Sequence, residues 1–297
     1  MRRRFVTLDV FTARRFAGNP LAVVLDVDGL DRDTMQAVAR EFNYPETVFT
    51  FAPGDSTHRA QVRIFTPAQE LPFAGHPTVG TAVLLGLRDG ATAGREFVLE
   101  EGVGPVRCTL ESNGGERGRA RFTVPQLPTE VGPAPDDAMI AAALQLAPTQ
   151  VGFAGWRPAR WSAGIPIAFV PVAGLGAIGA CRPDPDRLAS AFGERAVVYV
   201  FCAETIEQGH AFHARMFAPG LGVPEDPATG AAAAAFAGLL AARGGLADGD
   251  HAISIEQGYE MGRPSLIGLV IAMRAGKLAS ASIGGDAIIV TEGTIEA

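Results

Sequence analysis

Hydrophobic and polar positions alternate along this chain in many short segments, which are separated by a few stretches with helical spacing. Alternation over 4–8 residues is typical of half-buried strands, whereas apolar residues three or four apart indicate helices. The helical pattern covers residues 31–42, 76–87, 185–192 and 226–243. The strand pattern covers residues 5–10, 21–25, 46–51, 61–65, 96–99, 106–111, 120–124, 167–172, 196–202, 210–217, 253–257, two segments within 266–281, and 287–290. We therefore expect an α+β protein with mixed sheets around central helices.

The order of these elements repeats after about half of the chain. The segment 76–82, which begins with His76-Pro77, recurs as 226–232, which begins with Asp226-Pro227, and the offset is 226 − 76 = 150 residues. A polar residue followed by proline is typical of a helix start, so we interpret His76 and Asp226 as the tips of two equivalent helices. Three further matches keep the same order, namely 16–24 with 162–170, 63–67 with 215–219, and 99–102 with 255–258. A period this long indicates two domain-sized halves rather than a solenoid.

The proline-rich stretch 125–135 is the best candidate for a linker between these halves. We expect one domain to comprise residues 1–126 together with the last strand at about 283–297, and the other to comprise residues 127–282. A chain of 297 residues has the length of two such domains.

Composition narrows the classes of protein to consider. Hydrophobic residues are 47% and charged residues 19%, which argues against disorder, and a net charge of −7 argues against a nucleic-acid partner. The longest apolar run, 231–242, is too short to cross a bilayer, and no secretory signal follows the first basic residues. We expect a cytoplasmic protein. The cysteines Cys108, Cys181 and Cys202 have no metal-ligand spacing, so we expect reduced core thiols and no metal.

The paired helix starts are candidates for a binding site. The first turn of a helix has free N–H groups and the positive end of the helix dipole, and it attracts carboxylates. Two such starts facing one cleft predict a site for a small anionic substrate. The alternative is that both residues only cap their helices. That alternative would be preferred for Asp226 alone, but the pairing with His76 favours a functional site.

Glu46 is the candidate for proton transfer. Apolar neighbours disfavour the ionised carboxylate and raise its pKa toward the range of a general acid or base. The alternative is an ordinary exposed glutamate at the start of a strand. The second half offers no clear counterpart, because Glu194 lies nearby in the repeat without aligning.

Two other motifs are less informative. Residues 174–179 match GxGxxG, but Pro183 and Pro185 preclude the long helix that a dinucleotide site requires. Residues 161–164 partly match a nucleophile elbow, yet Arg160 stands where glycine is required.

Four segments together resemble the phenazine-biosynthesis (PhzF-like) isomerase family over nearly the whole chain. They are residues 16–23, 46–49, 65–67 with 70–77, and 226–230, and the stretch Glu-Leu-Pro-Phe-Ala-Gly-His-Pro at 70–77 is highly specific. The resemblance implies the diaminopimelate epimerase-like fold with two pseudo-symmetric halves, a homodimer, and no cofactor. It also implies that Glu46 shuttles a proton on the substrate, that His76 and Asp226 orient it, and that Gly75 lines the site. We expect Glu46, His76 and Asp226 to be the catalytic residues, with His76 and Asp226 binding polar groups of the substrate and relaying protons. We expect the site to be lined by Asn19, Gly75, Thr229 and Gly230.

Two departures from the family pattern concern substrate choice. Pro45 and Ala231 stand where the family commonly has serine, so two hydroxyls that could bind substrate are missing. Thiol-using relatives have a cysteine at each helix tip, whereas this chain has none there, which favours a single base.

We predict a cofactor-independent isomerase of a small carboxylic acid. The alternative is a non-catalytic binding protein for small anions that kept the cleft and lost turnover.

Overall fold

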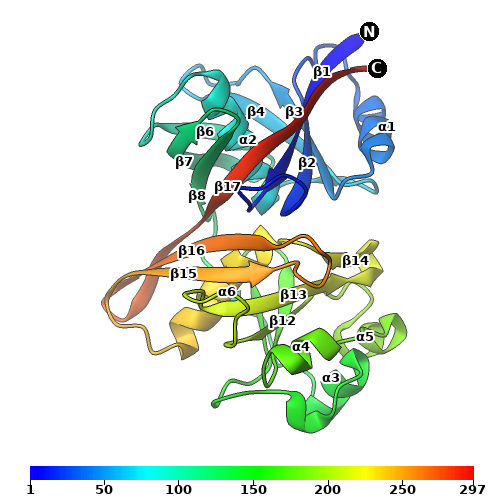
Figure 1. Cartoon of the computed structure of the whole chain (residues 1–297), viewed down its shortest axis with the longest axis vertical. Coiled ribbons are helices and arrows are strands. Elements are labelled where there is room, and N and C mark those ends of the chain that lie inside the picture. The colour runs from blue at the N-terminus through cyan, green and yellow to red at the C-terminus, as the bar shows by residue number, and fades with distance from the viewer. The chain divides into compact units, whose positions relative to one another are not determined.

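The computed structural model describes the backbone of residues 1–297 and the side chains of all of them except Ser112 and Asn113. The chain divides into two compact units, residues 1–125 with 283–297, and residues 126–282 (Figure 1). Both units contain mixed sheet and a central helix, so the expected α+β class is confirmed.

Helix α2 is the core of the first unit. All of its residues from Gly75 to Gly86 are buried, because its side chains are small or apolar on nearly every side. Gly80 lets the helix approach the sheet, since a Cβ there would lie 2.6 Å from Leu21 Cδ2 and 2.7 Å from Val10 Cγ2. The elements of this unit are β1 (Arg2–Val10), β2 (Asn19–Val24), α1 (Arg32–Phe42), β3 (Glu46–Phe51), β4 (Ala60–Phe65), β5 (Glu70–Leu71), α2 (Gly75–Arg88), β6 (Glu96–Glu101), β7 (Gly104–Gly114) and β8 (Arg117–Thr123).

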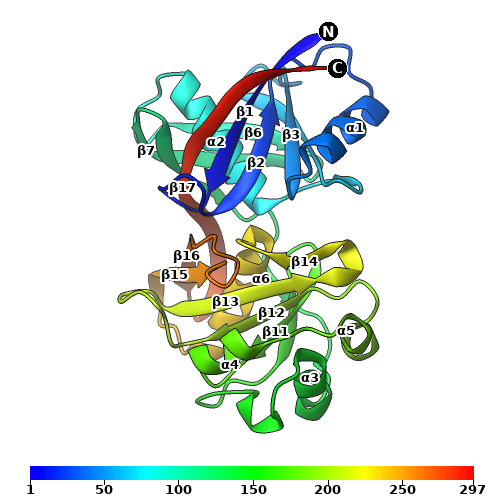
Figure 2. The ribbon, with the colours of Figure 1, turned by 45° about the vertical axis from the view of Figure 1, so that its right-hand side comes forward.

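The strands of the first unit form a closed sheet. Neighbours pair in the order β1, β2, β3, β4, β6, β7, β8, with β2–β3 and β4–β6 parallel and the other printed pairs antiparallel. The long strand β17 (Lys277–Glu296) pairs with both β8 and β1 and closes the ring. Its pairing with β1 joins Arg2 to Glu296, so the two chain termini lie side by side (Figure 2).

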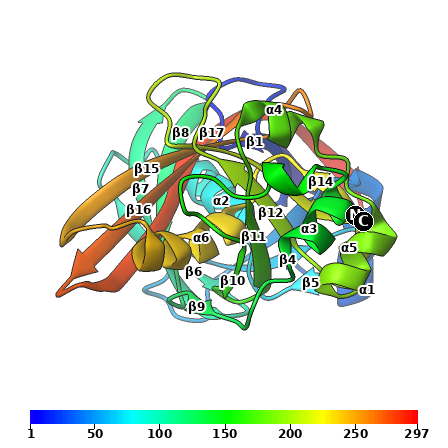
Figure 3. The same cartoon turned by 90° about the horizontal axis from the view of Figure 1, so that it is seen from below.

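The second unit repeats this strand order around helix α6. Here β10, β11, β12, β13, β15 and β16 pair in sequence, again with the second and fourth of these pairs parallel. Three short helices, α3, α4 and α5, pack with β11 and β12 around a further apolar core (Figure 3). The elements are β9 (Thr129–Glu130), α3 (Asp137–Leu144), β10 (Ala159–Ser162), β11 (Pro166–Pro171), α4 (Leu175–Ala180), α5 (Pro185–Phe192), β12 (Val198–Cys202), β13 (Phe212–Ala218), β14 (Val223–Asp226), α6 (Gly230–Arg243), β15 (Gly249–Gln257) and β16 (Ser265–Arg274).

The structural repeat differs from the one expected at the helix starts. The central helices begin at Gly75 and Gly230, so the offset there is 230 − 75 = 155 residues and not 150. His76 therefore corresponds to Ala231, while Asp226 corresponds to Leu71. The expectation that His76 and Asp226 are equivalent helix tips was wrong, because similar short sequences lie at different places relative to the two helices.

Neither residue is an N-cap. The N-cap of α2 is Ala74, and His76 is the second residue of the helix. Asp226 ends strand β14, and Thr229 is the N-cap of α6. Pro77 fits inside the first turn of α2, where a missing backbone N–H removes no helical hydrogen bond.

Other elements follow the sequence closely. The expected helices 31–42 and 185–192 are α1 and α5, with Asp31 and Asp184 as N-caps whose side chains accept backbone N–H groups. The strand expected at 287–290 is part of the much longer β17. Helices α3 and α4 were not expected, because one follows a proline-rich stretch and the other lies in a glycine-rich one.

We expect Gly238→Val to lower the free energy of unfolding by about 1–3 kcal/mol, because it overpacks the contact between α6 and β10. A Cβ at Gly238 would lie 2.4 Å from Trp161 Cε3 and 2.9 Å from Pro128 Cβ. Urea unfolding measures the change. The control is Gly176→Ala in α4, where a Cβ meets nothing within 4 Å. An unchanged midpoint for Gly238→Val would contradict this packing.

Candidate functional site

In the first unit, the fold brings together the side chains of Glu46 and His76. Glu46 is the first residue of β3, and His76 lies in the first turn of α2. His76 Nε2 is 3.3 Å from Glu46 Oε2, and the two side chains are 5% and 16% exposed, respectively. The two candidates for proton transfer are therefore neighbours with little access to water.

His76 is a neutral imidazole at neutral pH. Burial lowers its pKa to about 3, although a hydrogen bond to the backbone of Pro20 acts in the opposite direction. A proline has only its carbonyl oxygen to offer, so the ring donates an N–H to that oxygen. Nε2 faces Glu46 and makes no hydrogen bond to the described residues. The nitrogen that donates to the Pro20 carbonyl is therefore Nδ1.

This arrangement gives the pair a specific chemistry. With its proton on Nδ1, neutral His76 turns the lone pair of Nε2 toward the Glu46 carboxyl group. Two lone pairs at 3.3 Å repel each other, whereas one proton between them makes the contact favourable. A proton carried by Glu46 would therefore lie toward the lone pair of a neutral ring.

Two other candidates lie close in the fold to this pair. Asn19 begins β2, is completely buried, and precedes Pro20, whose carbonyl orients His76. Gly75 is the first residue of α2 and is also buried. Ala74, the N-cap, has no polar side chain to cover the first amides of the helix.

In the second unit, Asp226 and Thr229 are joined by a short hydrogen bond. The Thr229 hydroxyl donates to Asp226 Oδ2 at 2.5 Å, and both residues are 8% exposed. Thr229 does not use its side chain to cap α6, which begins at the next residue, Gly230. The hydroxyl thus holds the carboxylate at the start of this helix.

Gln257 is a residue of this group that the sequence analysis did not select. Its Nε2 donates to the Asp226 carbonyl at 2.7 Å and to Thr229 Oγ1 at 3.0 Å, and its Oε1 accepts the Thr229 N–H at 3.2 Å. The sequence match between segments 99–102 and 255–258 could have identified this residue. It aligns Gln257 with Glu101, which burial keeps protonated at neutral pH by raising its pKa to about 8. Both units thus have a neutral polar side chain at this position of the repeat.

The two units have different acid–base groups at corresponding positions. Strand pairing aligns Thr47 with Val198, since each lies opposite the corresponding phenylalanine of the next strand. Glu46 therefore corresponds to Val197, which is 4% exposed and apolar. His76 corresponds to Ala231, so the second unit has neither member of the Glu46–His76 pair.

The glycine-rich motif and the three cysteines are placed unfavourably for nucleotide binding and for thiol chemistry. The glycine-rich segment forms only the six-residue α4, and the Glu204 carboxylate accepts its Leu175 N–H at 2.8 Å, so an anion already occupies this end. All three cysteines are buried and free, and burial raises the pKa of Cys181 and Cys202 to about 12. Thiols with such pKa values are poor bases at neutral pH.

The described residues contain no group of three or more His, Cys, Asp or Glu side chains arranged to hold a metal ion. No helix within the described part of the chain is long and apolar enough to span a membrane.

Comparisons with known proteins agree with the fold. The profile of the family described as phenazine biosynthesis-like protein (PhzC-PhzF) matches residues 8–293. An uncharacterized isomerase of Mesorhizobium japonicum is 49% identical over 99% of this chain and 98% of its own length. The trans-2,3-dihydro-3-hydroxyanthranilate isomerase of Pseudomonas chlororaphis is 35% identical over 98% of each chain. The crystal structure of a Bacillus anthracis phenazine biosynthesis protein of the PhzF family matches with a TM-score of 0.90, 24% identity and full coverage of both chains.

We expect His76 to remain neutral, with its proton on Nδ1, from pH 8 down to about pH 5. Its pKa in the folded protein is about 3, below the usual value, so the stability it contributes is present above about pH 6.5 and is lost as the pH falls toward 3. ¹⁵N NMR of labelled histidine measures the protonation, and His76→Asn identifies the resonance. A titration midpoint near pH 6.5 would rule out the buried neutral ring.

Proposed function

The chain belongs to the phenazine biosynthesis-like family of isomerases, and we propose that it moves a proton on a small carboxylic acid without a cofactor. Glu46 is the general acid and base in this proposal. The observation that carries it is the 3.3 Å contact between Glu46 and a buried neutral His76.

The pair provides both forms of the catalyst that an isomerisation needs. In the resting pair Glu46 holds a proton beside neutral His76. Transfer of this proton to His76 Nε2 during the reaction leaves Glu46 as a carboxylate, which removes a proton from one carbon, and the electron pair shifts into the unsaturated system of the substrate. Glu46 then returns the proton to another carbon, and the original pair is restored. No atom is gained or lost, so neither an oxidant nor a second substrate is required.

The other candidates have binding roles in this proposal. Asp226, held by Thr229, orients a polar group of the substrate. The amides at Gly75 and Gly230 attract its carboxylate through the positive ends of the helix dipoles, and Asn19 contributes a further polar contact. The family resemblance also leads us to propose a homodimer. The net charge of −7 leads us to propose that it binds no nucleic acid, and we propose that it is cytoplasmic.

A mechanism with a single base agrees with the difference in acid–base groups between the two units. Val197 and Ala231 give the second unit no counterpart of Glu46 and His76, and the cysteines are buried. A racemase that uses two thiols would need a thiol at each helix start.

Ala231 and Pro45 support the second candidate, a binding protein for small anions. Neither residue has a hydroxyl for substrate, and both stand where the family commonly has serine. Such a protein would bind carboxylic acids and leave them unchanged.

We expect the wild-type enzyme to incorporate deuterium from D₂O into a carboxylic-acid substrate, and Glu46→Gln to lower this rate by about a hundredfold to ten-thousandfold. The first candidate is trans-2,3-dihydro-3-hydroxyanthranilate, on which the Pseudomonas relative acts by its name, followed by a panel of unsaturated carboxylic acids. NMR measures the label.

Glu194→Gln is the matched control, because Glu194 is exposed and has no place in the mechanism. Full exchange in Glu46→Gln would contradict the proposed role of Glu46. Acids that bind to wild type without any exchange would support the binding protein instead.

We also expect one base to return part of the proton that it removes. A substrate deuterated at the reacting carbon should keep some label in the product when it is converted in H₂O under single-turnover conditions, because the proton stays on the shielded pair. Mass spectrometry of the product measures the retained fraction. Complete loss of label in the first turnover would indicate two bases or free exchange with solvent.

A further inference from the structure

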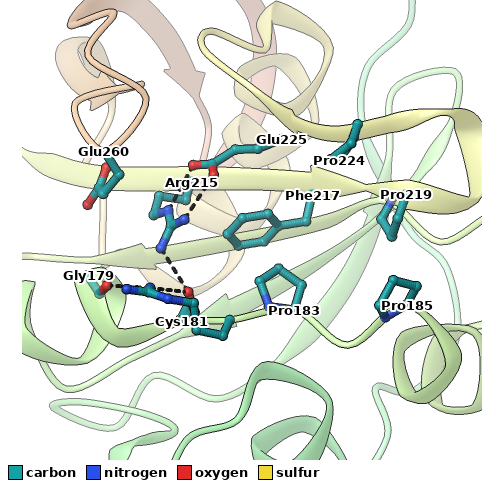
Figure 4. Close-up of a pocket in the computed structure, with 11 residues that line it drawn as sticks. Gly179, Cys181, Pro183, Pro185, Arg215, Phe217, Pro219, Pro224, Glu225 and Glu260 are labelled. Atoms are coloured by element: carbon teal, nitrogen blue, oxygen red, sulfur yellow. Dashed lines mark hydrogen bonds and ion pairs between the residues drawn. The ribbon is translucent and has the colours of Figure 1, made fainter.

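The second unit contains a cavity of about 530 Å³ beside strand β13 (Figure 4). This volume lies within the usual range of small-molecule sites, roughly 300–1,000 Å³. Two carboxylates, those of Glu225 and Glu260, line the cavity, together with Arg215 and Arg182. Its other walls are mostly apolar and are formed by Phe217, Pro183, Pro185, Pro219 and Pro224.

The internal repeat shows what the corresponding place in the first unit contains. There, Arg63 binds Glu70 through Nε and Nη2 at 2.6 and 2.8 Å, and a second arginine, Arg32, donates its Nε–H to Glu70 Oε2 at 3.1 Å. In the second unit, Arg215 binds Glu225 in the same bidentate way, at 2.8 and 2.9 Å. Among the described residues, no second arginine bonds to Glu225.

The missing arginine is replaced by a proline that lines the cavity. Arg32 follows the N-cap Asp31 and is the first residue of α1, and Pro185 follows the N-cap Asp184 and is the first residue of α5. Both helices lie between corresponding strands. The cavity is thus where a guanidinium group would reach Glu225 if the second unit had kept the arginine.

The lining groups fit a cation on an apolar stem. Each oxygen of Glu225 accepts one bond from Arg215, and a carboxylate oxygen can accept two. The nearby Arg182 does not fill this position, because its Nη1 donates to the carbonyls of Gly179 and Cys181. Glu260, whose Oε1 lies 3.0 Å from His213 Nε2, is a second carboxylate in the lining, and Phe217 offers an apolar surface to a short alkyl chain.

We propose that this cavity is a second small-molecule site, separate from Glu46 and His76, and that it binds an alkylguanidinium. The guanidinium forms the bond to Glu225 that Arg32 forms to Glu70, and the alkyl stem lies against Phe217 and Pro183. A planar guanidinium suits this carboxylate better than a compact ammonium, because it repeats the geometry present in the first unit.

The test uses two probes of the same shape, butylguanidinium and the neutral butylurea. Isothermal titration calorimetry on the full-length protein should show saturable binding of butylguanidinium at about millimolar concentration, and binding of butylurea should be at least about tenfold weaker. Equal binding of both compounds, or no binding of either, would overturn the proposal.

Two variants of one residue locate the site. Pro185→Arg restores the intramolecular arginine and should abolish butylguanidinium binding, whereas Pro185→Ala removes the ring without adding a cation and should keep the affinity within about twofold. Position 185 is exposed and begins a helix, so both variants are expected to fold, and circular dichroism checks this. Unchanged binding in Pro185→Arg would place the ligand elsewhere and contradict the assignment.

Discussion

One ion pair in each unit fixes where the central helix begins. An arginine of the middle strand, Arg63 or Arg215, binds a glutamate of the following short strand through two parallel hydrogen bonds. The planar fork of arginine determines the orientation as well as the distance of the carboxylate. In both units the glutamate lies five residues before the first residue of the helix, since 75 − 70 = 5 and 230 − 225 = 5.

The rest of each unit is built around this constraint. A glycine after the next strand lies against the proline that precedes each helix: a Cβ at Gly102 would lie 2.8 Å from Pro72 Cα, and one at Gly258 would lie 2.5 Å from the Pro227 carbonyl oxygen. The segment between this glutamate and the helix places His76 beside Glu46 in the first unit. In the second unit, the corresponding segment places Asp226 beside Thr229 and Gln257. The same scaffold thus holds two different sets of polar groups, and only the first contains a pair arranged for proton transfer.

The sequence was sufficient for the α+β class, the internal duplication and most strand positions, because these depend on local hydrophobic patterns. It was misleading at the helix starts, where proline lies inside the first turn of α2 but before α6. The better signal was the spacing Glu-x-Pro-x-x-Gly, present at residues 70–75 and 225–230. The neutral state of His76 could not be read from the sequence, since it depends on burial. The internal repeat marks position 257, but the hydrogen bonds of Gln257 depend on contacts between distant segments.

The central proposal is that Glu46 carries a proton at neutral pH and directs it toward the lone pair of neutral His76. Infrared difference spectroscopy between wild type and Glu46→Gln tests it most directly, because a protonated carboxyl group and a carboxylate absorb at separate frequencies. The account predicts that wild type at pH 7 has a protonated-carboxyl band that is absent from Glu46→Gln and reduced in His76→Leu. Only a carboxylate band for Glu46, unchanged in His76→Leu, would contradict it.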